Sequence, residues 1–121
     1  MLRLSPILIC LAGCGSLSPS AVGQWSGSCT LEDIEDAVGF ELDVYEEDQG
    51  EVRGEGMFFY NGYEFSGKVR GIRADKSIEL ELEGVSSGNA TRLEIFGNIV
   101  DNAVRGECSL HGVSGSLQMS R

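Results

Sequence analysis

Few side chains in this sequence have the chemistry for catalysis or metal binding. His111 is the single histidine among 121 residues, and it stands in the pair His111-Gly112, which is typical of a tight turn between two strands. It has no neighbouring carboxylate in the sequence and no second histidine with which to share a metal ion. We therefore expect His111 to be a turn residue, with no catalytic role and no metal site.

Clustered carboxylates are the other chemical possibility. Residues 46–48 read Glu-Glu-Asp and could exchange protons, but paired catalytic carboxylates must face each other across a cleft. These three stand beside a turn, so we predict that the protein is not an enzyme and has no cofactor. Weak Ca²⁺ binding through Asp33, Glu35 and Asp36, or through residues 46–48, is left open, although EF-hand spacing is absent.

The acidic residues are concentrated in one part of the chain. Nineteen Asp and Glu against nine Lys and Arg give a formal net charge of -10, which argues against nucleic acid binding. Residues 32–55 hold eleven of these acids and one base, Arg53. We predict an exposed, solvated face that repels an anionic membrane surface. A docking face for a basic partner is the alternative.

The N-terminus has the order of a signal peptide. One arginine precedes a short apolar run at residues 4–11, which is too short to span a bilayer. The tetrapeptide Leu11-Ala12-Gly13-Cys14 then resembles the lipobox of bacterial lipoproteins. This resemblance implies cleavage just before Cys14, acylation of its thiol and of the new amino group, and a lipid anchor in the membrane.

The same resemblance divides the chain into three parts. Residues 1–13 are expected to be the lipoprotein signal peptide, 14–23 the lipidated N-terminus and flexible tether, and 24–121 the folded domain. Gly15 stands directly after the acylated cysteine rather than Asp. In the lipoprotein family this implies sorting to the outer membrane, so we expect the protein at the outer membrane or cell surface.

Two cysteines are left for the folded domain. Cys10 would be discarded with the signal peptide and Cys14 lipidated, so that Cys29 and Cys108 remain in an exported, oxidising compartment. We predict a disulfide bond between them. In a closed meander the strands that carry them are second neighbours, so we expect a local bulge or incomplete closure to bring them together.

The folded domain must position these residues on short strands. Ile78, Leu80 and Leu82 alternate with glutamates, and turn signals recur about every ten residues. This pattern predicts an all-β fold, an antiparallel eight-stranded up-and-down meander barrel, with a two-sheet β-sandwich as the alternative. The predicted strands are 24–31, 38–46, 50–60, 63–72, 76–83, 91–100, 103–110 and 113–120.

Two of the turns predict strand register. Two-residue type I′ turns at Asn61-Gly62 and His111-Gly112 fix which residues lie opposite each other, and both inner faces come out apolar. Seven glycines on the inner faces should allow close approach of strands. The predicted pairs are Tyr60 with Tyr63, Phe58 with Phe65, Cys108 with Gly115 and Val104 with Met119; the glycines are Gly54, Gly56, Gly67, Gly71, Gly97, Gly106 and Gly115.

Eight antiparallel strands opened by Gly23-Gln24-Trp25 resemble small lipocalin-like or avidin-like barrels. Trp25 is the single tryptophan, so the cage of several tryptophans with which avidins hold biotin is missing. The residues expected to point inward are apolar, which predicts an interior filled by side chains. They are Phe40, Leu42, Val44, Phe58, Phe65, Val69, Ile78, Leu80, Leu82, Leu93, Ile95, Ile99, Leu110, Leu117 and Met119.

Together these observations predict a lipid-anchored, noncatalytic module of the bacterial cell envelope or cell surface, either protein-binding or structural. Met57 and Phe59 are expected to point outward near a strand end and form a possible contact surface for a protein partner. The expected partners are the membrane, through the lipid, and a protein of unknown identity. The alternative function is a barrel that binds a small apolar ligand.

Overall fold

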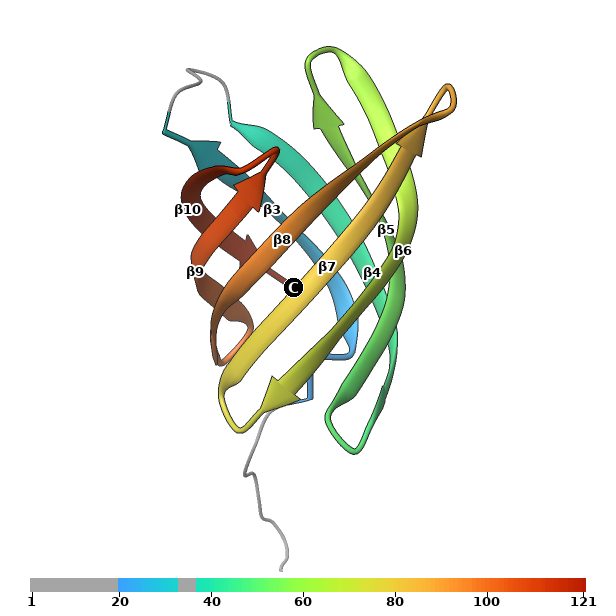
Figure 1. Ribbon diagram of the computed structural model, residues 1–121. Helices are drawn as coiled ribbons and strands as arrows, with labels where there is room; N and C mark the ends of the chain where they lie inside the picture. The colour runs from blue at the N-terminus through green and yellow to red at the C-terminus, as the bar shows by residue number, and fades with distance from the viewer. Residues whose placement is uncertain (1–19, 33–36) are drawn as a thin grey trace, which may run out of the picture.

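The described residues form a closed barrel of eight antiparallel strands (Figure 1). The computed structural model describes residues 20–32 and 37–121. Each strand pairs with its neighbours in sequence and the last returns to the first, so the predicted up-and-down barrel is confirmed and the sandwich alternative is wrong. The strands are β3 (Gly23–Leu31), β4 (Val38–Asp48), β5 (Glu51–Tyr60), β6 (Tyr63–Ala74), β7 (Ser77–Ser86), β8 (Asn89–Val100), β9 (Ala103–Leu110) and β10 (Val113–Ser120).

Tight turns connect most of the strands. In four of them a residue with φ between 51° and 56° precedes a glycine that also has positive φ, which is the mirror-image turn that matches strand twist. The β4–β5, β6–β7 and β8–β9 turns lie at one end of the barrel, the lower end in Figure 1, and the β5–β6, β7–β8 and β9–β10 turns lie at the other. The four turns are Gln49-Gly50, Asn61-Gly62, Ser87-Gly88 and His111-Gly112.

Strand pairing follows the predicted register. Every predicted strand end lies within three residues of the observed one, because alternating patterns and turn residues are local signals. The register of β4 against β5 shifts between Val44 and Glu46, so that Tyr45, which is 57% exposed, and the next residue, Glu46, both lie on the outside. The four pairs predicted from the turns are confirmed: Tyr60 with Tyr63, Phe58 with Phe65, Cys108 with Gly115 and Val104 with Met119.

The interior of the barrel is packed with apolar side chains. All fifteen residues predicted to point inward are buried. Close strand approach at the inward glycines is also confirmed, since a Cβ on Gly67 would lie 1.8 Å from the carbonyl oxygen of Glu83. No helix long and apolar enough to cross a membrane occurs in residues 20–32 or 37–121. Further buried residues are Ala21, Trp25, Cys29, Leu31, Val38, Val52, Val104 and Cys108.

The predicted disulfide joins Cys29 to Cys108, with Cα atoms 5.9 Å apart. The two cysteines stand on either side of β10, where Cys29 pairs with Leu117 and Cys108 with Gly115. In a flat sheet two strand spacings would separate them by about 9–10 Å. The barrel is closed and the pairing of β10 has no register shift, so the expected bulge or gap is wrong. The wall instead folds sharply at Gly115, where a Cβ would lie 2.3 Å from the oxygen of Thr30.

Candidate functional site

The predicted lipidation site, Cys14, lies outside the described residues, as do residues 1–13 and the calcium candidates at 33–36. The description begins at Ser20, ahead of the predicted start of the folded domain at Gln24. The segment that would join an anchor to the barrel can therefore be followed from Ser20 into β3.

Ala21 lies just ahead of β3, at one end of the barrel. Its side chain belongs to the apolar core and the residue is fully buried. The backbone N–H of Ala21 donates to Glu47 Oε1 at 2.8 Å, and its carbonyl oxygen accepts the indole N–H of buried Trp25 at 2.8 Å. Both peptide groups of this residue are thus held by side chains of the barrel, which buried backbone groups require.

Glu47, which accepts from Ala21, also forms a shielded ion pair with Arg73. Arg73 Nε donates to Glu47 Oε2 at 2.8 Å, Arg73 Nη2 lies 2.6 Å from the same oxygen, and the Glu47 and Arg73 side chains are only 11% and 14% exposed. The hydrogen bond from Arg73 lowers the pKa of the Glu47 carboxyl, with a further contribution from the Ala21 N–H. The same bond raises the pKa of Arg73. Because Oε1 accepts from the Ala21 N–H and Oε2 accepts from Arg73, the single carboxylate of Glu47 links these two residues.

The last residue of the chain completes the arrangement. Arg121 donates from Nη1 to the carbonyl oxygens of Ser20, at 2.6 Å, and Val22, at 2.8 Å. Its guanidinium carbon lies 4.5 Å from the ring centre of Trp25, which is a cation–π contact. We call Ala21, Trp25, Glu47, Arg73 and Arg121 the tether latch, and the end of the barrel that holds it the tether end.

The acidic segment is exposed in most but not all of its described part. Glu41, Asp43, Glu46 and Asp48 are exposed, as predicted, whereas Glu47 is shielded against Arg73. Residues 46–48 therefore do not converge on one site. No group of three or more His, Cys, Asp or Glu side chains in the described ranges is arranged to hold a metal ion.

The opposite end of the barrel, which we call the far end, carries aromatic side chains. Phe58 and Phe65 stack in the core with ring centres 5.1 Å apart. Tyr60 packs at 5.5 Å against the ring of His111, which occupies its turn with φ of 53° as predicted. Tyr63 is 60% exposed. This end therefore presents aromatic rings to solvent, together with the exposed ion pair of Arg92 and Glu83 close to the β7–β8 turn.

The possible contact surface lies on the outer wall near the far end. Phe59 is 49% exposed and Met57 is half-buried, and both belong to the outward row of β5. Ser66 lies opposite Met57, and Val85, 50% exposed, lies opposite Ser66. Because serine is small, the apolar surface of Met57 and Phe59 extends toward β7. Their role in binding a partner stays a prediction.

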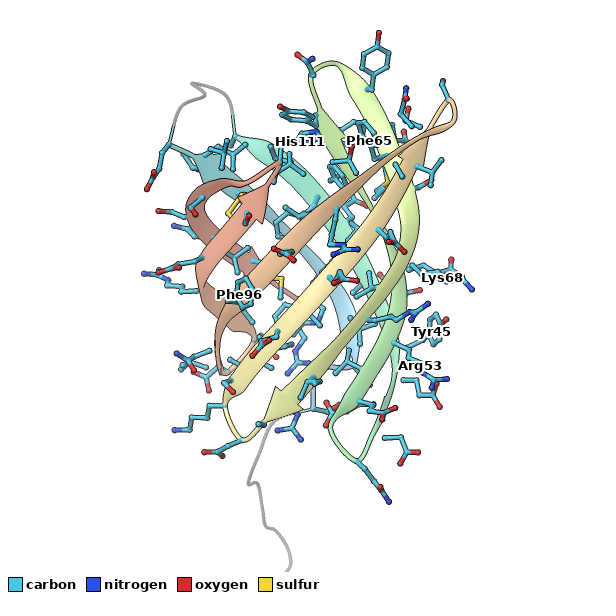
Figure 2. All side chains as sticks on the ribbon, in the orientation of Figure 1. Tyr45, Arg53, Phe65, Lys68, Phe96 and His111 are labelled. Atoms are coloured by element: carbon cyan, nitrogen blue, oxygen red, sulfur yellow. A yellow bond between two sulfur atoms is a disulfide. The ribbon has the colours of Figure 1, made fainter. Side chains whose placement is uncertain are left out.

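A groove of about 480 Å³ crosses the outer wall over β5 to β8, and the sequence analysis did not find it. Gly71 is among the residues that line it. Two rows of outward side chains border it, one from each side, and Figure 2 shows Arg53 and Phe96 among them on the outside of the barrel. The first row is Glu51, Ile72, Glu79 and Phe96; the second is Arg53, Arg70, Glu81 and Glu94.

The tether latch was also missed by sequence reasoning. Its hydrogen bonds join residues that are 26 to 101 positions apart, except for the bond between Trp25 and Ala21. The single tryptophan beside the predicted tether was the available signal, and its indole N–H needed a buried acceptor.

Comparison with known proteins supports the fold. The chain is similar to a solved structure described as a redesigned beta barrel, with 13% sequence identity, a TM-score of 0.67, and coverage of 83% of this chain and 90% of that one. At this identity the likeness is one of fold alone. No protein-family model and no curated protein matches the sequence.

Proposed function

We propose that this protein is a lipid-anchored, noncatalytic module of the bacterial cell envelope, held at the outer membrane or cell surface, that binds another protein. The observation that carries the proposal is the tether latch. In the described part of the barrel, Glu47 and Arg121 make the side-chain hydrogen bonds that join distant parts of the chain. Their partners include the backbone of Ser20, Ala21 and Val22. These residues directly follow the expected tether from Cys14.

The latch suits a chain that is held by its N-terminus. A force applied through an acyl anchor at Cys14 would enter the described structure at Ser20. The hydrogen bonds of Glu47, Arg73 and Arg121 would distribute this force to β4, β6 and the end of β10. Six residue steps from Cys14 to Ser20 span at most about 20 Å. An anchored barrel would therefore turn its tether end toward the membrane and its far end away from it.

Charge at the tether end fits the same orientation. Asp48 and Asp101 are exposed in or beside turns at this end, and Glu46 and Glu51 are exposed close by. Carboxylates repel the negative surface of anionic lipids within about a Debye length of about 8 Å. The barrel would then stand off the membrane at the length of its tether.

Mass spectrometry of the protein extracted from membranes in detergent tests the anchor. We expect a chain that begins at Cys14 and carries acyl groups on that residue. Cys14→Ser should leave residues 1–13 attached, because cleavage of a lipoprotein precursor follows acylation. An unmodified N-terminus at another residue would overturn the lipid anchor.

Crosslinking in intact envelopes tests the contact surface. The double variant Met57→Ser with Phe59→Ser should lose the crosslinked partner while its thermal midpoint changes little, because both side chains point outward. Val100→Ser is the matched control, since Val100 is 62% exposed but lies at the tether end. Equal crosslinking by wild type and the double variant would remove Met57 and Phe59 as the contact surface.

A further inference from the structure

Four charged residues lie in register on four neighbouring strands of the outer wall. The registered pairs Arg53 with Arg70, Arg70 with Glu81, and Glu81 with Glu94 place one outward side chain on each of β5, β6, β7 and β8. The row therefore carries two positive charges followed by two negative charges. We call these four residues the charge row.

Within one molecule each arginine of the charge row lies opposite a carboxylate on a neighbouring strand, Arg53 opposite Glu46 and Arg70 opposite Glu81, but neither pair forms an ion pair in the described residues. Like charges directly opposite each other on neighbouring strands are destabilising, and the row has two such pairs, Arg53 with Arg70 and Glu81 with Glu94. Arg53 reaches Glu51 only at 3.9 Å, between side chains that are 63% and 73% exposed. In the described part of the chain Arg70 and Glu94 have no ion pair.

Glu81 has one partner outside the row. Arg92 approaches Glu81 at 3.6 Å and Glu83 at 3.4 Å, with all three side chains more than 40% exposed. Exposed pairs at such distances contribute about 0–1 kcal/mol. Glu81 can therefore exchange this contact for a better one at little cost.

Large apolar side chains border the same groove. Ile72 is 60% exposed and Phe96 is 42% exposed, on either side of Glu79 in the row next to the charge row. Ile72 lies two residues before the end of β6 and Phe96 four residues before the end of β8, and the residues directly opposite both of them are glutamates. Apolar residues at a charged groove add area that a bound protein would remove from water.

We propose that the charge row binds the charge row of a second copy of this chain, across a two-fold axis that runs parallel to the strands between β6 and β7. This rotation reverses the order of the row. Arg53 then faces Glu94 of the second copy, and Arg70 faces its Glu81. Four ion pairs form between the two copies. Each like-charged pair within one copy then lies against two opposite charges of the other copy.

The order of charges favours a second copy over another partner. A basic segment would neutralise Glu81 and Glu94 but would leave Arg53 and Arg70 without a partner, and an acidic segment would do the reverse. A two-fold interface uses the same patch on both molecules, so the patch must be complementary to itself when reversed. A row of two positive and two negative charges meets this condition.

The same rotation places Phe96 opposite Glu51, and Ile72 opposite Glu79, of the second copy, so the neighbouring row adds apolar area but no ion pair. Rotation about an axis along the strands also keeps both tether ends pointing the same way along that axis. Two copies anchored in one membrane could therefore meet in this way, although the pairing of the rows does not depend on the anchor.

The interface is expected to be weak and sensitive to salt. The charge row spans three strand spacings, about 14 Å, so the contact falls at the small end of protein interfaces. Anchoring two copies in one membrane would raise their effective concentration and favour the pair. Salt should weaken it because its charges lie at the surface.

Co-purification of a tagged and an untagged full-length copy, extracted together from whole cells in non-ionic detergent, tests the proposal. Tagged wild type should retain untagged wild type at low salt. The variant Arg53→Glu with Arg70→Glu, and the variant Glu81→Arg with Glu94→Arg, should each lose self-capture by about tenfold or more. When one is tagged and the other untagged, capture should return, because a fully acidic row then faces a fully basic one.

A matched control separates the row from net charge. Lys76→Glu with Arg105→Glu makes the same change in charge as Arg53→Glu with Arg70→Glu, but at a turn and on β9. We expect it to self-associate as wild type does. The proposal is overturned if wild type stays monomeric, if the two reversed variants fail to capture each other, or if the row captures only a different protein. Loss of acylation at Cys14 would overturn the lipid anchor and leave this result unaffected.

Discussion

The tether end and the far end of the barrel are stabilised by different kinds of contact. At the tether end, Glu47 and Arg73 form a shielded ion pair that also holds the backbone of Ala21. Toward the far end, Cys29 and Cys108 form a covalent bridge two residues from the ends of β3 and β9. One end therefore depends on the ionisation of side chains, and the other depends on the redox state of two thiols.

The difference means that the stability of the two ends of this small barrel can be changed separately, one end through ionisation and the other through disulfide reduction. Hydrogen bonds and ion pairs at the tether end hold the chain where its N-terminal segment enters, so their loss would free that segment before the barrel opened. The disulfide crosses β10 and joins β3 to β9 where the wall folds at Gly115. Perturbing each end in turn tests whether they act independently.

Removing the disulfide should produce the largest effect. Cys29 and Cys108 are 79 residues apart in sequence, and on the chain-entropy model a crosslink over such a loop stabilises the fold by about 4–5 kcal/mol. The double variant Cys29→Ala with Cys108→Ala should lower the thermal midpoint by about 20 °C or more. Circular dichroism melting measures this, and reductant should bring wild type to the same midpoint. A loss below about 1 kcal/mol would contradict the chain-entropy account of this bridge.

Truncating Glu47 should have the next largest effect. Glu47→Ala leaves the Arg73 guanidinium and the Ala21 N–H without their acceptor in a shielded site, so we expect a loss of about 2–3 kcal/mol in the free energy of unfolding. Glu46→Ala, at an exposed neighbour, should change it by less than about 0.5 kcal/mol. Urea unfolding at neutral pH measures both. Equal losses would show that the latch adds nothing beyond surface charge.

The contrast between the two ends also separates what the sequence could predict from what it could not. The far-end register followed from Asn61-Gly62 and His111-Gly112, because turn chemistry and alternation act over a few residues. The disulfide followed from counting cysteines. The contacts of the tether latch join residues that are far apart in sequence and meet only when the barrel closes. A local sequence pattern therefore cannot predict them.

Glu47 illustrates the missing information. Simple alternation from Val44 would turn Glu46 inward and Glu47 outward. The register shift between Val44 and Glu46 reverses this order, so that Glu47 pairs with buried Val52 and turns toward Arg73. The bulge has no signature in the sequence, and the charge row was hidden for a similar reason, since it exists only once four strands are aligned.

Acid should weaken the tether end specifically. The hydrogen bond from Arg73 lowers the pKa of Glu47 in the folded state, so the folded protein binds the Glu47 proton less readily than the unfolded chain does. The stability contributed by this group is therefore present above the unfolded value, about pH 4.3, and is lost as the pH falls through the lower folded value. Glu47→Gln should remove this part of the pH dependence. An identical acid profile for wild type and Glu47→Gln, measured as free energy of unfolding, would contradict it.

The smallest effect is expected at the far end, from the ring contact between His111 and Tyr60. His111 stands at φ of 53°, a conformation that asparagine also tolerates, so His111→Asn removes the ring and keeps the turn. We expect a loss of about 0.5 kcal/mol, since the contact lies at a partly exposed rim. His111→Val should cost more than His111→Asn because a β-branched residue fits positive φ poorly. If His111→Asn instead matched Glu47→Ala in urea unfolding, the far end would depend on a polar or aromatic contact as strongly as the tether end depends on its ion pair.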